Sequence, residues 1–279
     1  MLRNDTPDVI AICSGKGGVG KTNVAANLAV ALGQAGRRVQ LLDADLGLAN
    51  IDVLLGLQPR LNLAHVVAGK ASLEDVFVSG PAGIDIVPAS SGNFDMTDLC
   101  PAEHAAIVKS FADLECLPDV LIVDTAAGIA PAVARFVAAA QHAFVVVCDE
   151  PASITDSYAL IKVFSRHYGI RRFNVVTNQS RGRRAGAELF AKLLRVADAY
   201  LDVALVHAGD IPADGRLVKA VQEQRAVVEA YPKSPASLAF RALAERVGKL
   251  PRPRELTGGI EFFLERLLAG SAAAREVSA

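Results

Sequence analysis

One glycine-rich segment restricts the possible folds of this chain more than any other feature of its sequence. Residues 15–22 match the pattern G-x-x-x-x-G-K-[ST] and come just after a short apolar run at residues 9–13. Glycines allow the backbone to curl so that successive N–H groups point inward, and a helix that starts at the end of the loop adds its positive end. The segment therefore predicts a strand, a phosphate-binding loop and a helix, with Lys21 at the β and γ phosphates and the Thr22 hydroxyl on Mg²⁺. A glycine turn that binds nothing is the alternative.

Short β-branched apolar runs alternate along the chain with segments that have apolar residues at helical spacing. Each run is apolar on successive residues, which indicates strands that are buried on both faces. We therefore predict an α/β fold that is doubly wound, with a mostly parallel sheet and helices on both faces. The expected strands are residues 9–13, 39–42, 84–87, 120–123, 144–148 and 173–177, and the expected helices are residues 22–34, 101–114, 131–141, 153–168, 185–200 and 234–247.

The composition of the 279 residues excludes several classes of protein. Hydrophobic residues make up 52% of the chain and charged residues 21%, so the chain can bury a core and is not expected to be disordered. The net charge of −1 provides no overall attraction to nucleic acid or to acidic lipid. The four cysteines lack metal-ligand or paired spacing, which favours a reducing cytoplasm. No apolar stretch reaches the ~20 residues that span a bilayer. We expect one domain over residues 8–248.

Three carboxylates stand at the ends of predicted strands and should meet at one edge of the sheet. Asp43 and Asp45 follow the second strand, and Asp124 follows the apolar residues 120–123. Asp124 has the position of a Walker B carboxylate, which would hold Mg²⁺ directly or through water, and capping of a helix is its alternative role. We expect Asp45 to lie in the loop after the strand and, of Asp43 and Asp45, to be the one that contacts water.

Two further segments are candidate nucleotide contacts. Gly128 ends residues 124–128, and its backbone N–H is expected to sense a γ-phosphate, with an ordinary tight turn as the alternative. Asn178 stands where a guanine-binding protein would begin Asn-Lys-x-Asp, but Arg181 occupies the fourth place. Without a carboxylate to accept the donors of guanine, the Asn178 amide suits adenine better, so we predict ATP rather than GTP. A turn role is the alternative for Asn178.

Lys16 is not required by an ordinary phosphate-binding loop. It makes residues 16–22 resemble the deviant Walker A loop of the MinD/ParA family of dimerising ATPases, in which this lysine contacts the nucleotide of the partner subunit. The resemblance implies a monomer with ADP, a homodimer with ATP and Mg²⁺, and slow ATP hydrolysis in which Lys16 neutralises charge in trans. It also implies that Asp45 positions the attacking water and that Asp43 supports the metal and the loop. A solvated loop lysine is the alternative for Lys16.

The resemblance extends to residues outside the loop. It implies that Asn178 and the turn at residues 211–214 flank adenine, and that Glu150 and Asp156 lie at the dimer face near the ribose and Lys16. The complete predicted site has catalytic residues Lys16, Lys21 and Asp45, metal-binding residues Thr22, Asp43 and Asp124, and nucleotide-binding residues Gly15, Lys16, Gly17, Gly18, Val19, Gly20, Lys21, Thr22, Asn23, Asp43, Gly128, Glu150, Asp156, Asn178, Pro212 and Asp214.

Within the MinD/ParA family, the chain most resembles the FlhG/FleN family of flagellar-number ATPases, over residues 43–57, 124–129, 148–162 and 219–240. This resemblance implies control of flagellar number by restraint of a flagellar AAA+ transcription activator (FleQ-like) and antagonism of a polar GTPase (FlhF-like). The element D-Q-A-x-x-L-R, with which some members stimulate that GTPase, does not occur before the first predicted strand. A ParA-type DNA partition ATPase and a MinD-type division-site regulator are the alternatives. Direct DNA binding is not expected, because the basic cluster at residues 181–184 has no interleaved aromatic residues.

The last part of the chain differs from the rest in composition. Residues 249–259 contain two prolines, two glycines and three basic residues, and are expected to be a linker. Residues 260–270 predict an amphipathic helix with an apolar face made by Ile260, Phe263, Leu264, Leu267 and Leu268. We expect this helix to bind a membrane weakly as one copy and effectively as two copies in an ATP-held dimer, which places the protein in the cytoplasm and reversibly at the inner membrane or cell pole. Docking of the helix on the protein's own body is the alternative.

Overall fold

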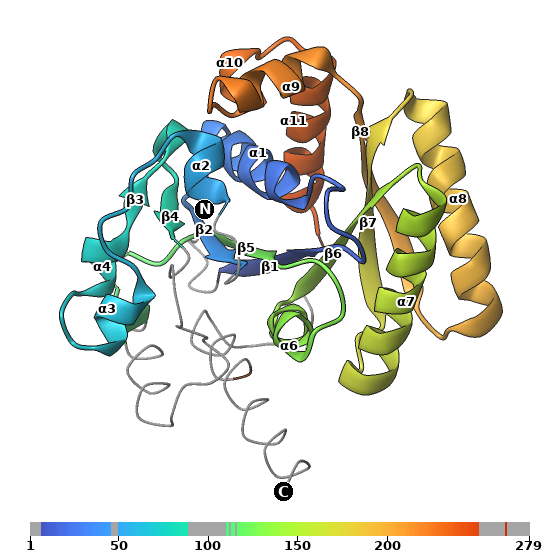
Figure 1. The fold of residues 1–279 in the computed structure, drawn as a ribbon, viewed down its shortest axis with the longest axis horizontal. Helices are drawn as coiled ribbons and strands as arrows, with labels where there is room; N and C mark the ends of the chain where they lie inside the picture. Colours follow the sequence, from blue (N-terminus) through green and yellow to red (C-terminus); the bar gives the residue numbers. More distant parts are fainter. Residues whose placement is uncertain are drawn as a thin grey trace, which may run out of the picture.

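An eight-stranded sheet runs through the centre of the computed structural model, which describes residues 7–45, 50–88, 110–111, 113–114, 116–250 and 266. The strand order is β3-β4-β2-β5-β1-β6-β7-β8, and every neighbouring pair except β3 and β4 is parallel. The predicted doubly wound α/β fold is confirmed (Figure 1). The strands are β1 (Asp8–Cys13), β2 (Val39–Ala44), β3 (Val78–Ser79), β4 (Asp85–Val87), β5 (Val120–Thr125), β6 (His142–Cys148), β7 (Arg172–Ser180) and β8 (Ala204–Pro212).

Helices cover both faces of the sheet and bury a separate hydrophobic core on each (Figure 1). One face carries α1 (Lys21–Gln34), α2 (Ile51–Leu55), α9 (Gly215–Gln222), α10 (Val227–Ala230) and α11 (Pro235–Val247). The other face carries α3 (Leu63–Val67), α4 (Leu73–Val76), α6 (Pro131–Ala139), α7 (Pro151–Tyr168) and α8 (Arg183–Tyr200). A short 3₁₀-helix, Pro81–Gly83, precedes β4.

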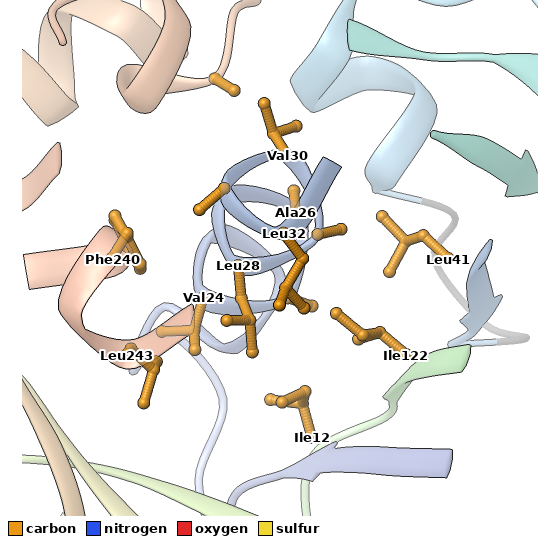
Figure 2. Packing of buried hydrophobic residues seen from close by; sticks show 14 of the residues in the cluster. Ile12, Val24, Ala26, Leu28, Val30, Leu32, Leu41, Ile122, Phe240 and Leu243 are labelled. Atoms are coloured by element: carbon orange, nitrogen blue, oxygen red, sulfur yellow. The ribbon is translucent and has the colours of Figure 1, made fainter. Parts of the chain in front are cut away.

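The central strand β1 is buried from both sides. Residues 9–13 are at most 1% exposed, and alternate residues contribute to the two cores. Figure 2 shows the core around α1, which is surrounded by Ile12 and Ile122 from the sheet and by Phe240 and Leu243 from α11. Each fully buried side chain of this kind contributes roughly 1.5–3 kcal/mol. The loop that follows β1 therefore starts from one of the most firmly held points of the molecule.

Two strands and five short helices were not indicated by the sequence pattern. The strand β8 contains Gly209, Asp210 and Pro212, residue types that are depleted in strands. It lies at the edge of the sheet, where most of its residues are only partly buried. The other unpredicted strand, β3, has two residues and pairs antiparallel at the opposite edge. The helices α2, α3, α4, α9 and α10 have four to eight residues, too few for an apolar period to be clear.

Several sequence predictions concern residues outside the described part of the chain. The amphipathic helix at residues 260–270 lies there except for residue 266, as do most of the linker at 249–259 and of the helix at 101–114. Residues 46–49, just after Asp45, also lie outside. Among the helices of the described ranges, none has the length and apolar character needed to cross a bilayer.

Candidate functional site

The predicted phosphate-binding loop joins β1 to α1 and forms one wall of a cavity. The cavity has a volume of about 770 Å³, within the size range of small-molecule sites. Of the predicted site residues, it is lined by residues 16–23 and by Asp45, so the loop and one of the three carboxylates meet there. Other lining residues come from α2 and from the end of α9.

Two glycines of the loop are required by the close approach of other elements. A Cβ atom at Gly15 would overlap the backbone of Asp156 and Ser157 in α7. A Cβ atom at Gly20 would overlap Nδ2 of Asn178, and Gly20 also has a left-handed backbone with a φ of 87°. The loop is therefore held between α7 and the end of β7.

Lys21 and Asp124 form a buried ion pair beneath the loop. Nζ of Lys21 lies 3.3 Å from Oδ1 of Asp124, and the side chains are 8% and 1% exposed. Burial raises the pKa of Asp124, while the Lys21 ammonium and hydrogen bonds from Thr22 and Lys21 oppose that shift. Oδ2 of Asp124 has no hydrogen-bond partner among the described residues. A buried, unsatisfied carboxylate oxygen next to the Thr22 hydroxyl offers the hard oxygen ligands that Mg²⁺ takes together with phosphate oxygens, so these residues fit the predicted metal.

Asp43 lies beside Asp124, because the register of β2 and β5 pairs the two residues. Oδ1 of Asp43 accepts a hydrogen bond from the Asp45 N–H at 3.1 Å, and Oδ2 accepts from the N–H groups of Asn50 and Ile51 at 3.2 and 3.3 Å. Burial and the charge of Asp124 raise the pKa of Asp43 to about 7, although these hydrogen bonds oppose the shift. Asp43 thus anchors the chain at Asp45 and at the start of α2, and its predicted support of the metal stays a prediction.

Lys16 contacts the start of α7 in its own subunit. Its Nζ lies 2.6 Å from Oε2 of Glu150, and the two side chains are 39% and 57% exposed. The hydrogen bond and charge of Glu150 raise the pKa of Lys16, and the charge of Asp156 adds to the shift. The structure therefore brings Lys16 together with Glu150 and Asp156, and Lys16 lines the cavity and is partly exposed, whereas Lys21, the predicted phosphate-binding lysine, is buried.

Gly128 and Asn178 are both bonded to the backbone next to the loop. The Gly128 N–H donates to the Ser14 carbonyl at 2.8 Å, so sensing of a γ-phosphate would require this bond to open. Nδ2 of the buried Asn178 side chain donates to the Val19 carbonyl at 2.7 Å, and Oδ1 has no partner among the described residues. Because a carbonyl can only accept, Val19 fixes the amide with its oxygen free.

Pro212 and Asp214 lie outside the cavity of the loop. Pro212 ends β8 and lines a separate cavity of about 620 Å³. Asp214 caps α9, where its carboxylate accepts hydrogen bonds from the Arg216 N–H at 2.8 Å and from the Ala236 N–H at 3.0 Å. The side chain of Asp214 thus connects the starts of α9 and α11, and the adenine contacts implied for both residues stay predictions.

The cavity contains residues that the sequence analysis did not select as site residues. Two of them are Ser14 and Ala127. The others come from α2 and its cap and from α9 and the turn after it, namely Asn50, Val53, Leu54, Val221, Gln222 and Gln224. Both segments carry the family resemblance, but the spacing along the chain does not show that they meet. Their proximity depends on tertiary contacts between distant parts of the chain, such as the hydrogen bond between Gln224 and Val53, which are 171 positions apart.

A glycine-rich loop between a central parallel strand and a helix, with a buried lysine and aspartate beneath it, defines a P-loop NTPase. Residues 5–248 match the ParA family, described as NUBPL iron-transfer P-loop NTPase. The chain belongs to this ParA/MinD family of P-loop NTPases.

The most informative relatives are flagellar proteins. The chain is 56% identical to the antiactivator FleN of Pseudomonas aeruginosa over 93% of each chain. It is 32% identical to the flagellum site-determining protein YlxH of Helicobacter pylori, over 93% of this chain and 89% of that protein. A solved structure of the septum site-determining protein MinD complexed with Mg-ADP, from Pyrococcus horikoshii OT3, matches with a TM-score of 0.64 and 28% identity over 91% of this chain and 98% of that chain. The resemblance inferred from the sequence motifs is confirmed.

Proposed function

We propose that this protein is a dimerising ATPase that controls flagellar number by acting as an antiactivator. The observation that carries the proposal is the position of Lys16, a second lysine of the loop that lies partly exposed at the rim of the cavity. A cation at the rim is available to a partner subunit, whereas Lys21 is buried within its own subunit. The printed functions of FleN and YlxH support the flagellar part of the proposal.

The proposed nucleotides are ATP and ADP, bound with Mg²⁺. The N–H groups of the loop and the positive end of α1 would hold the phosphates, and Lys21 would neutralise their charge. Thr22 and Asp124 would hold Mg²⁺, which supplies positive charge to the phosphate oxygens when it is bound. The free Oδ1 of Asn178 favours a base that presents an amino group, which adenine has where guanine has a carbonyl.

Asp45 is the proposed group that orients the attacking water. It lines the cavity, and its backbone N–H is held by Asp43. In the dimer, Lys16 would leave Glu150 and neutralise the charge that develops on the partner's nucleotide. Because each subunit would complete the site of the other, hydrolysis would be slow and would depend on dimerisation.

Exposed apolar side chains around the cavity support association with a second copy of the chain. Val53 and Val221 line the cavity and are 61% and 36% exposed. Val218, on the same helix as Val221, is 59% exposed, and Ile129 follows the Gly128 turn and is 49% exposed. Such apolar residues beside a ligand site are typical of an interaction surface.

The proposed partners follow from the flagellar relatives. The ATP-bound dimer would restrain a flagellar AAA+ transcription activator, and an FlhF-like GTPase would be a second partner. We place the protein in the cytoplasm and reversibly at the inner membrane or cell pole, with two copies of residues 260–270 acting together on the membrane. Direct DNA binding is not part of the proposal, and Arg184 of the basic cluster is paired with Glu188 at 2.9 Å.

The proposal is tested by light scattering and ATP hydrolysis on the wild type and two variants. We expect the wild type to be monomeric with ADP, Asp45→Ala to bind ATP as a dimer without hydrolysing it, and Lys16→Ala to bind nucleotide without turnover. Monomeric Asp45→Ala at saturating ATP, or full turnover in Lys16→Ala, would contradict the switch. Affinity capture on the Asp45→Ala dimer should retain a flagellar activator, and retention of DNA instead would favour a partition ATPase.

A further inference from the structure

The short helix α2 is bonded at its start to a nearby carboxylate and near its end to a residue that is distant in the sequence. A helix of five residues is not stable by itself in water. At its start, the N–H groups of Asn50 and Ile51 donate to the Asp43 carboxylate. Near its end, Nε2 of Gln224 donates to the Val53 carbonyl at 3.1 Å. Apart from the burial of Ile51, Leu54 and Leu55 in the core, α2 is therefore attached by one carboxylate of the candidate site and by one glutamine after α9.

Gln224 occupies a backbone position that usually belongs to glycine. It follows the C-cap of α9 and has a φ of 54°, in the left-handed region. The Gln224 N–H donates to the Val221 carbonyl and the Arg225 N–H donates to the Ala220 carbonyl, which is the Schellman arrangement of a helix end. Glycine would be favoured at this φ, because a Cβ atom is strained there. Glycine has no side-chain amide, however, and so could not donate the hydrogen bond to α2.

The contact between Gln224 and α2 is close as well as hydrogen-bonded. Gly56, which ends α2 with a φ of 63°, would carry a Cβ atom only 3.3 Å from Cβ of Gln224. Gln224 lines the nucleotide cavity together with Val53 and Leu54. The end of α9 and the end of α2 thus fit each other directly at the wall of the cavity.

We propose that Gln224 is a positioning residue, which holds α2 against the nucleotide cavity and thereby keeps Asp43 and Asp45 in place. Gln224 acts on the two aspartates through α2: α2 is bonded to Asp43 at its other end, and Asp43 in turn holds the backbone of Asp45. The inference rests on the proposed ATPase function, in which Asp45 orients the attacking water. It assigns a role to part of the segment 219–240, which carries the family resemblance.

Two substitutions of Gln224 separate this role from simple support of the fold. Gln224→Ala removes the amide and keeps the disfavoured backbone, whereas Gln224→Gly removes the amide and relieves the backbone. We expect both variants to lose turnover at saturating ATP about fivefold, as loss of one hydrogen bond predicts. The melting temperature of Gln224→Gly should equal or exceed that of the wild type. Arg225→Ala is the matched control, because Arg225 lies in the same turn and pairs with Glu229 rather than with α2.

Hydrogen exchange provides a readout that does not require hydrolysis. Amides of residues 53–56 should exchange faster in Gln224→Gly than in the wild type or in Arg225→Ala. Wild-type turnover in Gln224→Gly, or unchanged exchange in α2, overturns the proposal. A wild-type protein that binds no ATP contradicts the proposed function instead, and the exchange experiment then still decides whether Gln224 holds α2.

Discussion

The buried carboxylate of Asp43 should make the protein without nucleotide less stable as the pH rises from about 4 to 7. Its pKa in the folded protein is raised from 3.8 to about 7. Below the lower value Asp43 is protonated in the folded and in the unfolded chain, so it has no effect on stability. Between the two values only the unfolded chain ionises, which favours unfolding, and above about 7 the full effect is present. At about 1.4 kcal/mol per pKa unit, the free energy of unfolding falls by about 4 kcal/mol over this range.

The substitution Asp43→Asn removes this titration and so isolates its contribution. The side-chain amide of the variant has one acceptor oxygen, whereas both oxygens of the Asp43 carboxylate accept hydrogen bonds. The free energy of unfolding of the variant is therefore lower by about 1 kcal/mol per lost hydrogen bond at every pH. The informative quantity is therefore the pH dependence of the difference in unfolding free energy between the two proteins. It should change by about 4 kcal/mol in favour of the variant between pH 4 and 7.5.

Urea unfolding without nucleotide or Mg²⁺ measures this difference at each pH. Asp75→Asn is the control, because hydrogen bonds from Ser72 lower the pKa of the exposed Asp75, so that its titration lies below this pH range and the difference should stay nearly constant. A difference between Asp43→Asn and the wild type that is constant from pH 4 to 7.5 would refute the argument that the folded protein holds this carboxyl group in its neutral form.

Two further substitutions test contacts around the loop. Glu150→Gln removes the charge that holds Lys16 and should lower the ATP concentration at half-maximal dimer formation by about threefold, measured by light scattering; a higher concentration would show that Glu150 assists the dimer instead. Gly15→Ala forces a methyl group against the backbone of α7 and should lower the free energy of unfolding by about 1–3 kcal/mol, measured by denaturant unfolding. Gly17→Ala is its control, since in the described part of the chain no atom other than those of Gly17 and its two neighbours in sequence lies within 4 Å of a Cβ there. An equal effect of both substitutions would contradict the packing argument.

The sequence predicts best those parts of the fold and the site that are formed by residues close together in the chain. The spacing of residues 15–22 specifies the loop, and the apolar residues before Asp124 specify a buried strand that ends in a carboxylate. No local pattern predicts the pairing of Lys16 with Glu150, because the two residues are 134 positions apart, and only the family resemblance implies that they lie near each other. The contact between Gln224 and Val53, which are 171 positions apart, was indicated neither by a local pattern nor by the resemblance. Edge strands such as β8 are also difficult to predict, because partial burial permits polar residues and glycine.

The phosphate-binding loop and the parts around it are attached to the molecule in different ways. The loop continues β1 and α1, whose side chains fill the cores, so its ends cannot shift without disturbing the close packing of both. By contrast, single hydrogen bonds or ion pairs attach Gly128 to Ser14 and Lys16 to Glu150. Replacing one such hydrogen bond or ion pair by another changes the free energy of the protein much less than opening a hydrophobic core would. In the proposed ATPase, nucleotide binding and release would therefore exchange these outer contacts and leave the two cores unchanged.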